Sequence, residues 1–99
     1  MRYLAQMART FVSVELRDRR ALARFSMEMD SLGFRQTVRG RKKGLPLKLP
    51  VGVFLLERAS AFEALELARK AAGNTNVQAR FFCVPAGGEV RFGNLCPCA

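Results

Sequence analysis

The fold is decided by residues 10–17, Thr-Phe-Val-Ser-Val-Glu-Leu-Arg, and by the helical pattern that directly follows them. Apolar and polar side chains alternate in this run, which is typical of a half-buried strand. The side that predicts a core is made by Val12, Val14 and Leu16. The opposite side carries Phe11, Ser13, Glu15 and Arg17. We therefore expect a first strand with a core face and a mixed aromatic and charged face.

A first helix is predicted directly after this strand. Asp18 is a plausible N-cap, and Gly33 ends the helix. Apolar residues at spacings of three and four form one helical stripe: Leu22, Phe25, Met29 and Leu32.

Three more strands and a second helix follow. Alternation predicts a strand from Phe34 to Gly40, with Phe34, Gln36 and Val38 on one face. Glycines and prolines from Gly40 to Pro50 indicate a long loop, and Val51 to Glu57 is the third strand. Ser60 and Glu63 form a capping box at the start of a second helix. This helix is predicted to end near Ala72, with Gly73 as its stop, and to bury Leu65, Ala68 and Ala72. Asn74 to Asn76 is a loop, and Val77 to Pro85 is the fourth strand.

The order β-α-β-β-α-β predicts an α+β, ferredoxin-like sandwich. Because crossovers are right-handed, both helices should cover one face of a four-stranded antiparallel sheet. The 99 residues fit a single domain, with an N-terminal lead at 1–8 and a C-terminal tail at 86–99. Glu89 to Phe92 could add an edge strand to that sheet.

The composition favours an anionic partner. Lys and Arg number 17 against 8 Asp and Glu, which gives a net charge of +9. Arginine matches phosphate oxygens two at a time, so nucleic acid is favoured over membrane. No apolar stretch is long enough to span a membrane, and the start lacks the apolar region of a signal peptide. Three cysteines without framework spacing indicate the reducing cytoplasm.

The basic residues concentrate around the predicted second strand and the loop after it. Between Ser31 and Leu56 no residue is acidic, and six are basic: Arg35, Arg39, Arg41, Lys42, Lys43 and Lys48. Arg41 to Lys43 lies between glycines and could follow a phosphate backbone. The alternative is an ordinary solvated hairpin tip.

The sheet face away from the helices is predicted to be open, aromatic and basic. It would hold Phe11, Ser13, Glu15, Arg35, Thr37, Arg39, Arg80 and Phe82, with either Phe54 and Leu56 or Val53 and Leu55 from the third strand. Such a face can stack bases while arginines hold phosphates. Alternatively, a second copy of the chain covers Phe11 and Phe82, which is the reading we favour and which makes the protein a homodimer.

Catalysis has few candidate groups. The chain has no histidine, so the commonest acid–base residue is missing. Asp18 and Glu15, beside Arg17, could hold Mg²⁺ near a phosphate, which makes them the candidate catalytic pair. The alternatives are a helix cap for Asp18 and an arginine partner for Glu15. Cys96-Pro97-Cys98 reads as a frayed tail, so no metal-ligand set is predicted.

Three segments together resemble the GhoS family of small bacterial antitoxins: Ala8 to Asp18, Met29 to Val38, and Leu49-Pro50. That family is ferredoxin-like and similar in fold to the small endonuclease of the CRISPR spacer-integration complex. The resemblance implies an endoribonuclease-type antitoxin that cuts the message of a toxin. It also implies that Asp18 falls near an acidic position of that endonuclease, and that Arg20 and Arg24 contact RNA.

The leading hypothesis is therefore an RNA-binding, endoribonuclease-type antitoxin that cleaves or sequesters a toxin message. The alternative is a non-enzymatic module on a ferredoxin-like dimer that binds nucleic acid or a protein. A small-ligand regulatory domain is a third hypothesis, because the fold alone does not select among them.

Overall fold

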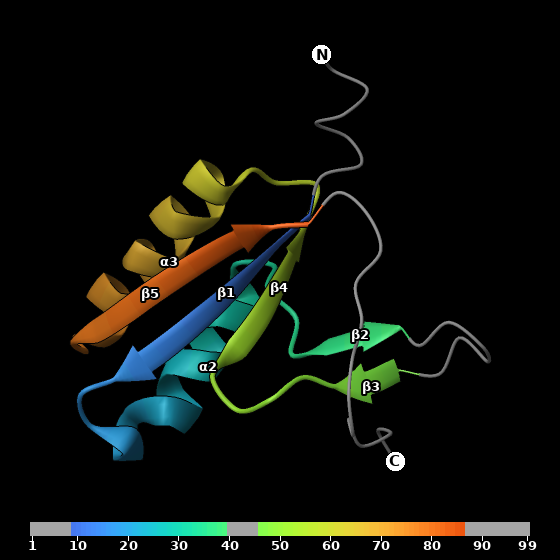
Figure 1. The fold of residues 1–99 in the computed structure, drawn as a ribbon. Helices are drawn as coiled ribbons and strands as arrows, with labels where there is room; N and C mark the ends of the chain where they lie inside the picture. The colour runs from blue at the N-terminus through green and yellow to red at the C-terminus, as the bar shows by residue number, and fades with distance from the viewer. Residues whose placement is uncertain (1–8, 40–45, 87–99) are drawn as a thin grey trace.

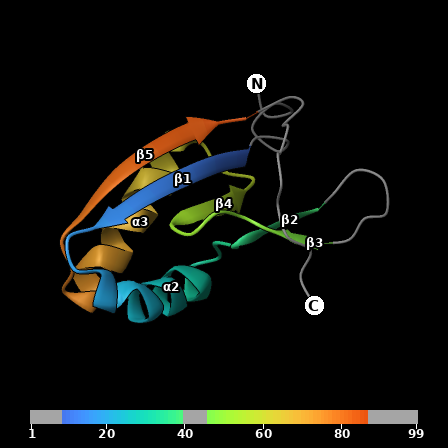
Figure 2. The ribbon, with the colours of Figure 1, turned by 60° about the horizontal axis from the view of Figure 1, so that its bottom comes forward.

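The computed structural model describes residues 9–39 and 46–86, which form an α+β fold with two helices on one face of a sheet (Figures 1 and 2). The main sheet has the order β4-β1-β5 and is antiparallel throughout, with β1 at Arg9–Leu16, β4 at Val53–Glu57 and β5 at Ala79–Pro85. The helices are α2 at Leu22–Ser31 and α3 at Ala61–Thr75. A separate two-stranded sheet pairs β2, Thr37–Arg39, with β3, Pro46–Lys48.

The core lies between the main sheet and the helices, as the alternation of β1 predicts. Val12 is fully buried, opposite Phe54 of β4 and Cys83 of β5. The Phe54 ring meets two other buried rings edge to face, that of Phe25 at 6.0 Å and that of Phe34 at 6.4 Å between centroids. Such edge-to-face pairs add specific geometry to the apolar burial. These rings therefore join α2, the segment after it and β4 in one core.

The predicted N-cap at Asp18 is confirmed, but the helix after it starts differently. The Asp18 carboxylate accepts a hydrogen bond from the backbone N–H of Arg20 at 3.0 Å. The first turn is a 3-10 helix, η1, at Arg19–Ala21, and the α-helix begins only at Leu22. A 3-10 turn is common at a helix start.

The capping box of α3 is confirmed, while its predicted end is wrong. Ser60 Oγ accepts from the Glu63 N–H at 3.1 Å, and the Glu63 carboxylate accepts from the Ser60 N–H at 3.0 Å. The helix runs through Gly73 to Thr75 and ends at Asn76, which adopts the left-handed conformation at φ 55°. Asparagine tolerates that conformation better than most residues. β5 accordingly begins at Ala79 rather than Val77.

The buried stripe of α3 is also shifted from the predicted one. Ala64, Ala68 and Ala71 are fully buried, whereas Leu65 and Ala72 are only half-buried. Small side chains on this stripe let α3 approach the sheet closely, so the larger Leu65 lies beside the contact rather than within it.

The predicted four-stranded sheet is not formed as one continuous ladder. Only Arg35 pairs with β4, through a bridge with Leu55 whose two backbone hydrogen bonds measure 2.8 and 2.7 Å. The chain then bends at Gln36, and Thr37–Arg39 pairs with β3 instead. The predicted strand Phe34 to Gly40 is therefore broken at Gln36 into a single bridge at Arg35 and the strand β2, while the predicted loop Gly40 to Pro50 contains β3.

The third predicted strand starts two residues late because of Gly52. This glycine has φ +86° and sits in a turn, and its carbonyl accepts a 2.7 Å hydrogen bond from the Val14 N–H of β1. Regular pairing therefore begins at Val53. The turn with positive φ at this point separates β3 from β4. Without it the two strands could continue as one.

Part of the predicted open face is covered. Leu55 of β4 is 1% exposed and clusters with Val38 and Leu49, with Phe11, Leu47 and Val53 packed against them. Val53 and Leu55 are thus the strand residues that point away from the helices. Val38, expected on the face of Phe34, belongs to this second cluster because the bend at Gln36 breaks the alternation. The lead at 1–8 and the tail from 87 onward, including Glu89 to Phe92, lie outside the described residues.

The contrast between Gly52 and Gly73 gives a matched test of this turn. In Gly52→Ala the new Cβ would lie 2.7 Å from the Val14 carbonyl oxygen, at a φ that alanine resists. We expect a loss of about 1–3 kcal/mol in the free energy of unfolding, measured by urea denaturation. In Gly73→Ala nothing lies within 4 Å of the new Cβ, so the helix should gain about 0.5–1 kcal/mol. Equal effects of the two substitutions would contradict the turn at Gly52.

Candidate functional site

Five arginines gather where β1 ends and η1 begins, and we call them the arginine rim: Arg17, Arg19, Arg20, Arg24 and Arg80. They border two adjoining hollows that share Arg17, Arg19 and Gln78. The first hollow also has an aliphatic wall, formed by Leu16, Leu22 and Val51 with Ala79. The end of the main sheet is therefore concave, cationic at its border and partly apolar inside.

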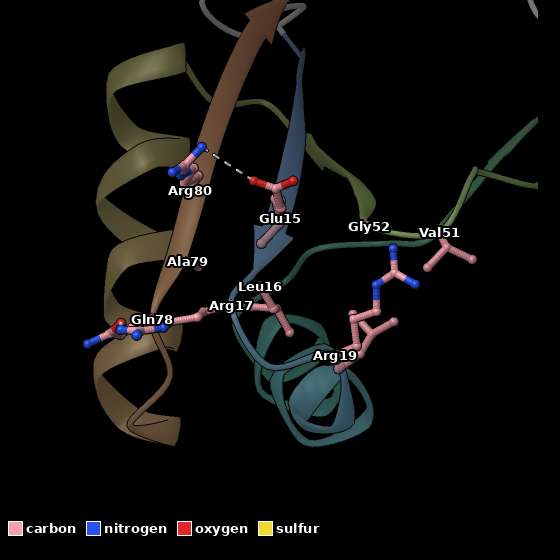
Figure 3. Close-up of a pocket in the computed structure, with 11 residues that line it drawn as sticks. Glu15, Leu16, Arg17, Arg19, Val51, Gly52, Gln78, Ala79 and Arg80 are labelled. Carbon is pink, nitrogen blue, oxygen red and sulfur yellow. Dashed lines mark hydrogen bonds and ion pairs between the residues drawn. The ribbon is translucent and has the colours of Figure 1, made fainter.

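Neighbouring elements hold the rim arginines in place (Figure 3). Arg17 is tied to the start of β5: its backbone N–H donates to the Gln78 carbonyl at 3.0 Å, and its guanidinium donates to the Gln78 side chain at 2.7 Å. Arg24 of α2 donates to the Thr75 carbonyl at the end of α3, at 3.1 Å. Arg19 extends toward Val51 on the other side of the first hollow.

Two carboxylates lie within the rim, and each is paired with an arginine. Asp18 contacts the Arg20 guanidinium at 3.1 and 3.3 Å. Glu15 contacts Arg80 at 3.7 Å across the β1–β5 pair, with both side chains largely exposed. Exposed pairs of this kind add little stability and are screened by salt. Five arginines against two carboxylates leave the rim with an excess of positive charge.

The hydrogen bonds of Asp18 determine its ionisation. The Arg20 side chain, and then the Arg20 backbone N–H, hold the pKa of the Asp18 carboxyl below its ordinary value, and Arg24 adds to this effect. The group is a carboxylate at neutral pH, as an ordinary aspartate is, and these hydrogen bonds extend its ionised range to lower pH. It serves as the cap of the first helical turn, the alternative role considered for it above.

Each carboxylate of the candidate catalytic pair contacts an arginine in the structure. Both Asp18 oxygens face the Arg20 guanidinium, and Glu15 faces Arg80. Within residues 9–39 and 46–86 no three acidic or cysteine side chains lie close enough together to hold a metal ion. Mg²⁺ takes oxygen ligands, so binding it here would require Asp18 and Glu15 to give up these exposed arginine contacts.

The second group of predicted basic residues lies elsewhere. Arg35 is beside β4, while Arg39 and Lys48 lie on the side of the β2–β3 hairpin opposite Val38 and Leu47. Figures 1 and 2 both show this hairpin projecting away from the end of β1 where the rim begins. Arg41, Lys42 and Lys43 lie outside the described residues. Of the predicted nucleic-acid contacts that the structure describes, three lie in the rim and three lie elsewhere, so they are divided between two regions.

Three residues of the site were not among the predicted nucleic-acid contacts: Arg19, Gln78 and Arg80. Arg80 could be placed on the outer face from alternation, but its position opposite Glu15 depends on the β1–β5 register. Of the predicted aromatic pair, Phe82 is 69% exposed, while Phe11 is half-buried in the second cluster.

Comparison with known proteins gives no assignment: no family model matches the chain, and neither does any curated protein. In the part of the chain that the structure describes, no helix is long and apolar enough to cross a membrane.

The role of Asp18 as a cap predicts an acid-dependent stability. Its pKa is lowered by folding, so its contribution is complete at neutral pH and is lost as the pH falls through that lowered pKa. We expect Asp18→Ala to lower the free energy of unfolding at pH 7 and to approach the wild type in acid, measured by urea denaturation across pH.

Asp18→Asn is the control for this experiment, because asparagine is also a good N-cap but does not titrate. It should keep more stability at pH 7 than Asp18→Ala. A constant difference between Asp18→Ala and the wild type at every pH would contradict an ionised cap.

Proposed function

We propose that this chain is an RNA-binding protein whose arginine rim contacts the phosphate backbone. The observation that carries the proposal is that five arginines, from η1, α2, β5 and the residue directly after β1, border the hollows at one end of the fold. Arginine binds phosphate through a planar fork of donors, and most protein contacts to nucleic acids are made to phosphates. The net charge of +9 supports the same partner.

The resemblance to GhoS supports a more specific form of the proposal, an antitoxin of the cytoplasm that acts on the message of a toxin. Sequestration is the form that the geometry favours. It requires only arginines that hold the message, whereas cleavage requires a free acid or base, and both candidate carboxylates are paired with arginines. The chain also has no histidine.

We further propose that the architecture is a variant of the ferredoxin-like sandwich. The antiparallel order β4-β1-β5 and the two helices on one face are shared with that fold. The Arg35–Leu55 bridge lies where its fourth strand would pair, beside β4. In this interpretation the hairpin is a fourth strand that leaves the sheet after one bridge.

A second candidate function is a protein-interaction module on a homodimer. The observation that favours it is the exposure of Phe82 and Val84, both on the outer side of the edge strand β5. Exposed apolar side chains on a sheet often mark an association surface.

The salt dependence of binding tests the rim. The logarithm of the RNA-binding constant falls linearly with the logarithm of the salt concentration, and each phosphate contact on a single strand contributes about 0.7 to the steepness. Replacing Arg17, Arg19 and Arg24 by Gln should therefore make this slope shallower by up to about 2. Fluorescence anisotropy with a labelled RNA at several salt concentrations measures this slope. The matched control replaces three other exposed cations by Gln and so removes the same charge. These are Arg58, which precedes α3, and Arg69 and Lys70, which lie on α3. If both triple variants change the slope equally, binding follows net charge and the rim is not the contact surface.

The choice between sequestration and cleavage is tested with labelled RNA incubated with and without Mg²⁺. We expect the RNA to be bound but to stay intact on a denaturing gel, because the paired carboxylates provide no metal site. Cleavage that is lost in both Asp18→Asn and Glu15→Gln would instead establish the endoribonuclease, with these two residues as its acids.

A further inference from the structure

We infer that the outer face of β1 and β5 binds unpaired nucleotides, with the Phe82 ring stacking on a base. This inference rests on the proposed RNA binding and names the form of RNA that the protein takes. We call this surface the outer strip, and it consists of Arg9, Ser13 and Glu15 of β1 with Arg80, Phe82 and Val84 of β5.

The Phe82 ring is open to solvent because of its partner across the strands. In the β1–β5 register Phe82 lies opposite Ser13, whose side chain is too small to cover a ring. The ring is 69% exposed, while its neighbour Phe81 points to the core and lies 6.5 Å from Phe25. Phe82 therefore presents a flat apolar surface between Arg80 and Val84 on the outer face of β5.

Arginines flank this ring along the strip. Arg80 is two residues away on the same face, about 6.6 Å along the strand, and its side chain is 89% exposed. Arg17 continues the charge toward the arginine rim, and Arg9 lies at the other end, over the Phe11 ring at 6.0 Å. The one acid, Glu15, makes only a 3.7 Å exposed pair with Arg80, so a phosphate can replace it at small cost.

This arrangement selects bases that are not paired. In a duplex the base faces are covered by their neighbours, so an aromatic side chain can stack only on an unstacked base. Single-strand binding proteins combine a cationic track with such rings. The second cluster covers the sheet face over β4, where Leu55 is buried, and part of Phe11 on β1, so the width left for a ligand is at most that of two strands. A single chain of nucleotides fits that width better than a double helix does.

A second copy of the chain is the less suitable occupant. Among the described residues of the strip, the exposed large apolar side chains are Phe82 and Val84 alone. A stable dimer interface buries a much larger and more apolar area. A two-fold contact centred on Phe82 would also bring Arg80 of one copy close to Arg80 of the other, and their like charges would repel.

The test compares Phe82→Leu with Phe62→Leu. Phe62 lies on α3, away from the outer strip, and is 72% exposed, so the two substitutions remove rings of similar exposure without changing charge. Binding is measured by anisotropy with a single-stranded RNA of about 12 nucleotides, within the usual range of site sizes, and with a duplex of the same length. We expect Phe82→Leu to weaken single-strand binding by about 5- to 150-fold, the effect of one lost base–aromatic stack, and to leave the salt slope unchanged. Phe62→Leu should bind like the wild type.

The outcomes separate this inference from the proposed function. If Phe82→Leu binds the single strand as tightly as the wild type, or if the wild type prefers the duplex, the stacking site is wrong and RNA binding stands. If the wild type binds neither RNA, both proposals fail. If sedimentation shows a wild-type dimer that Phe82→Leu dissociates while RNA binding is unchanged, the strip is an interface between copies.

Discussion

The structure depends on the pairing of β1 with a strand along each of its edges. β4 and β5 both run antiparallel to it, so β1 is the central strand of the main sheet. The two faces of β1 have different surroundings. Its even-numbered residues, Val12 and Val14, face the helices and the core. Its odd-numbered residues face outward and form half of the outer strip. β1 therefore contributes alternate residues to the core and to the outer face of the sheet.

The same strand positions the arginine rim. β1 ends at Leu16, and the chain turns at Asp18 into η1, so consecutive arginines diverge around one end of the sheet. The hydrogen bonds that hold them also stabilise the fold: Arg17 joins β1 to the start of β5, and Arg24 joins α2 to the end of α3. Asp18 is at once a cap and the partner of Arg20, so an acidic residue beside a basic cluster can have a structural role.

Elements with a local cause could be predicted well, and elements with a distant cause could not. The Ser60–Glu63 capping box depends on four consecutive residues, and it is formed as expected. The end of α3 was misplaced because Gly73 is a good stop by composition, yet Asn76 takes the left-handed position three residues later. The strand between Phe34 and Gly40 was overextended for a different reason. Its pattern alternates throughout, but after Arg35 the chain pairs with β3 instead of β4, and the identity of the pairing strand leaves no mark on the alternation.

The sequence alone was enough to establish the α+β class, the two faces of β1, the two helix caps and the excess of positive charge. The reason is that periodicity, capping and charge are properties of short segments. Only the tertiary structure decided which side chains meet. It placed Glu15 opposite Arg80 and Ser13 opposite Phe82, through a register that neither strand encodes alone. It also covered Leu55 and part of Phe11 with the hairpin while leaving Phe82 exposed. The physical reason is that alternation along a strand determines which face of the sheet a side chain points to. Whether that side chain is exposed depends on which other segment packs over that face.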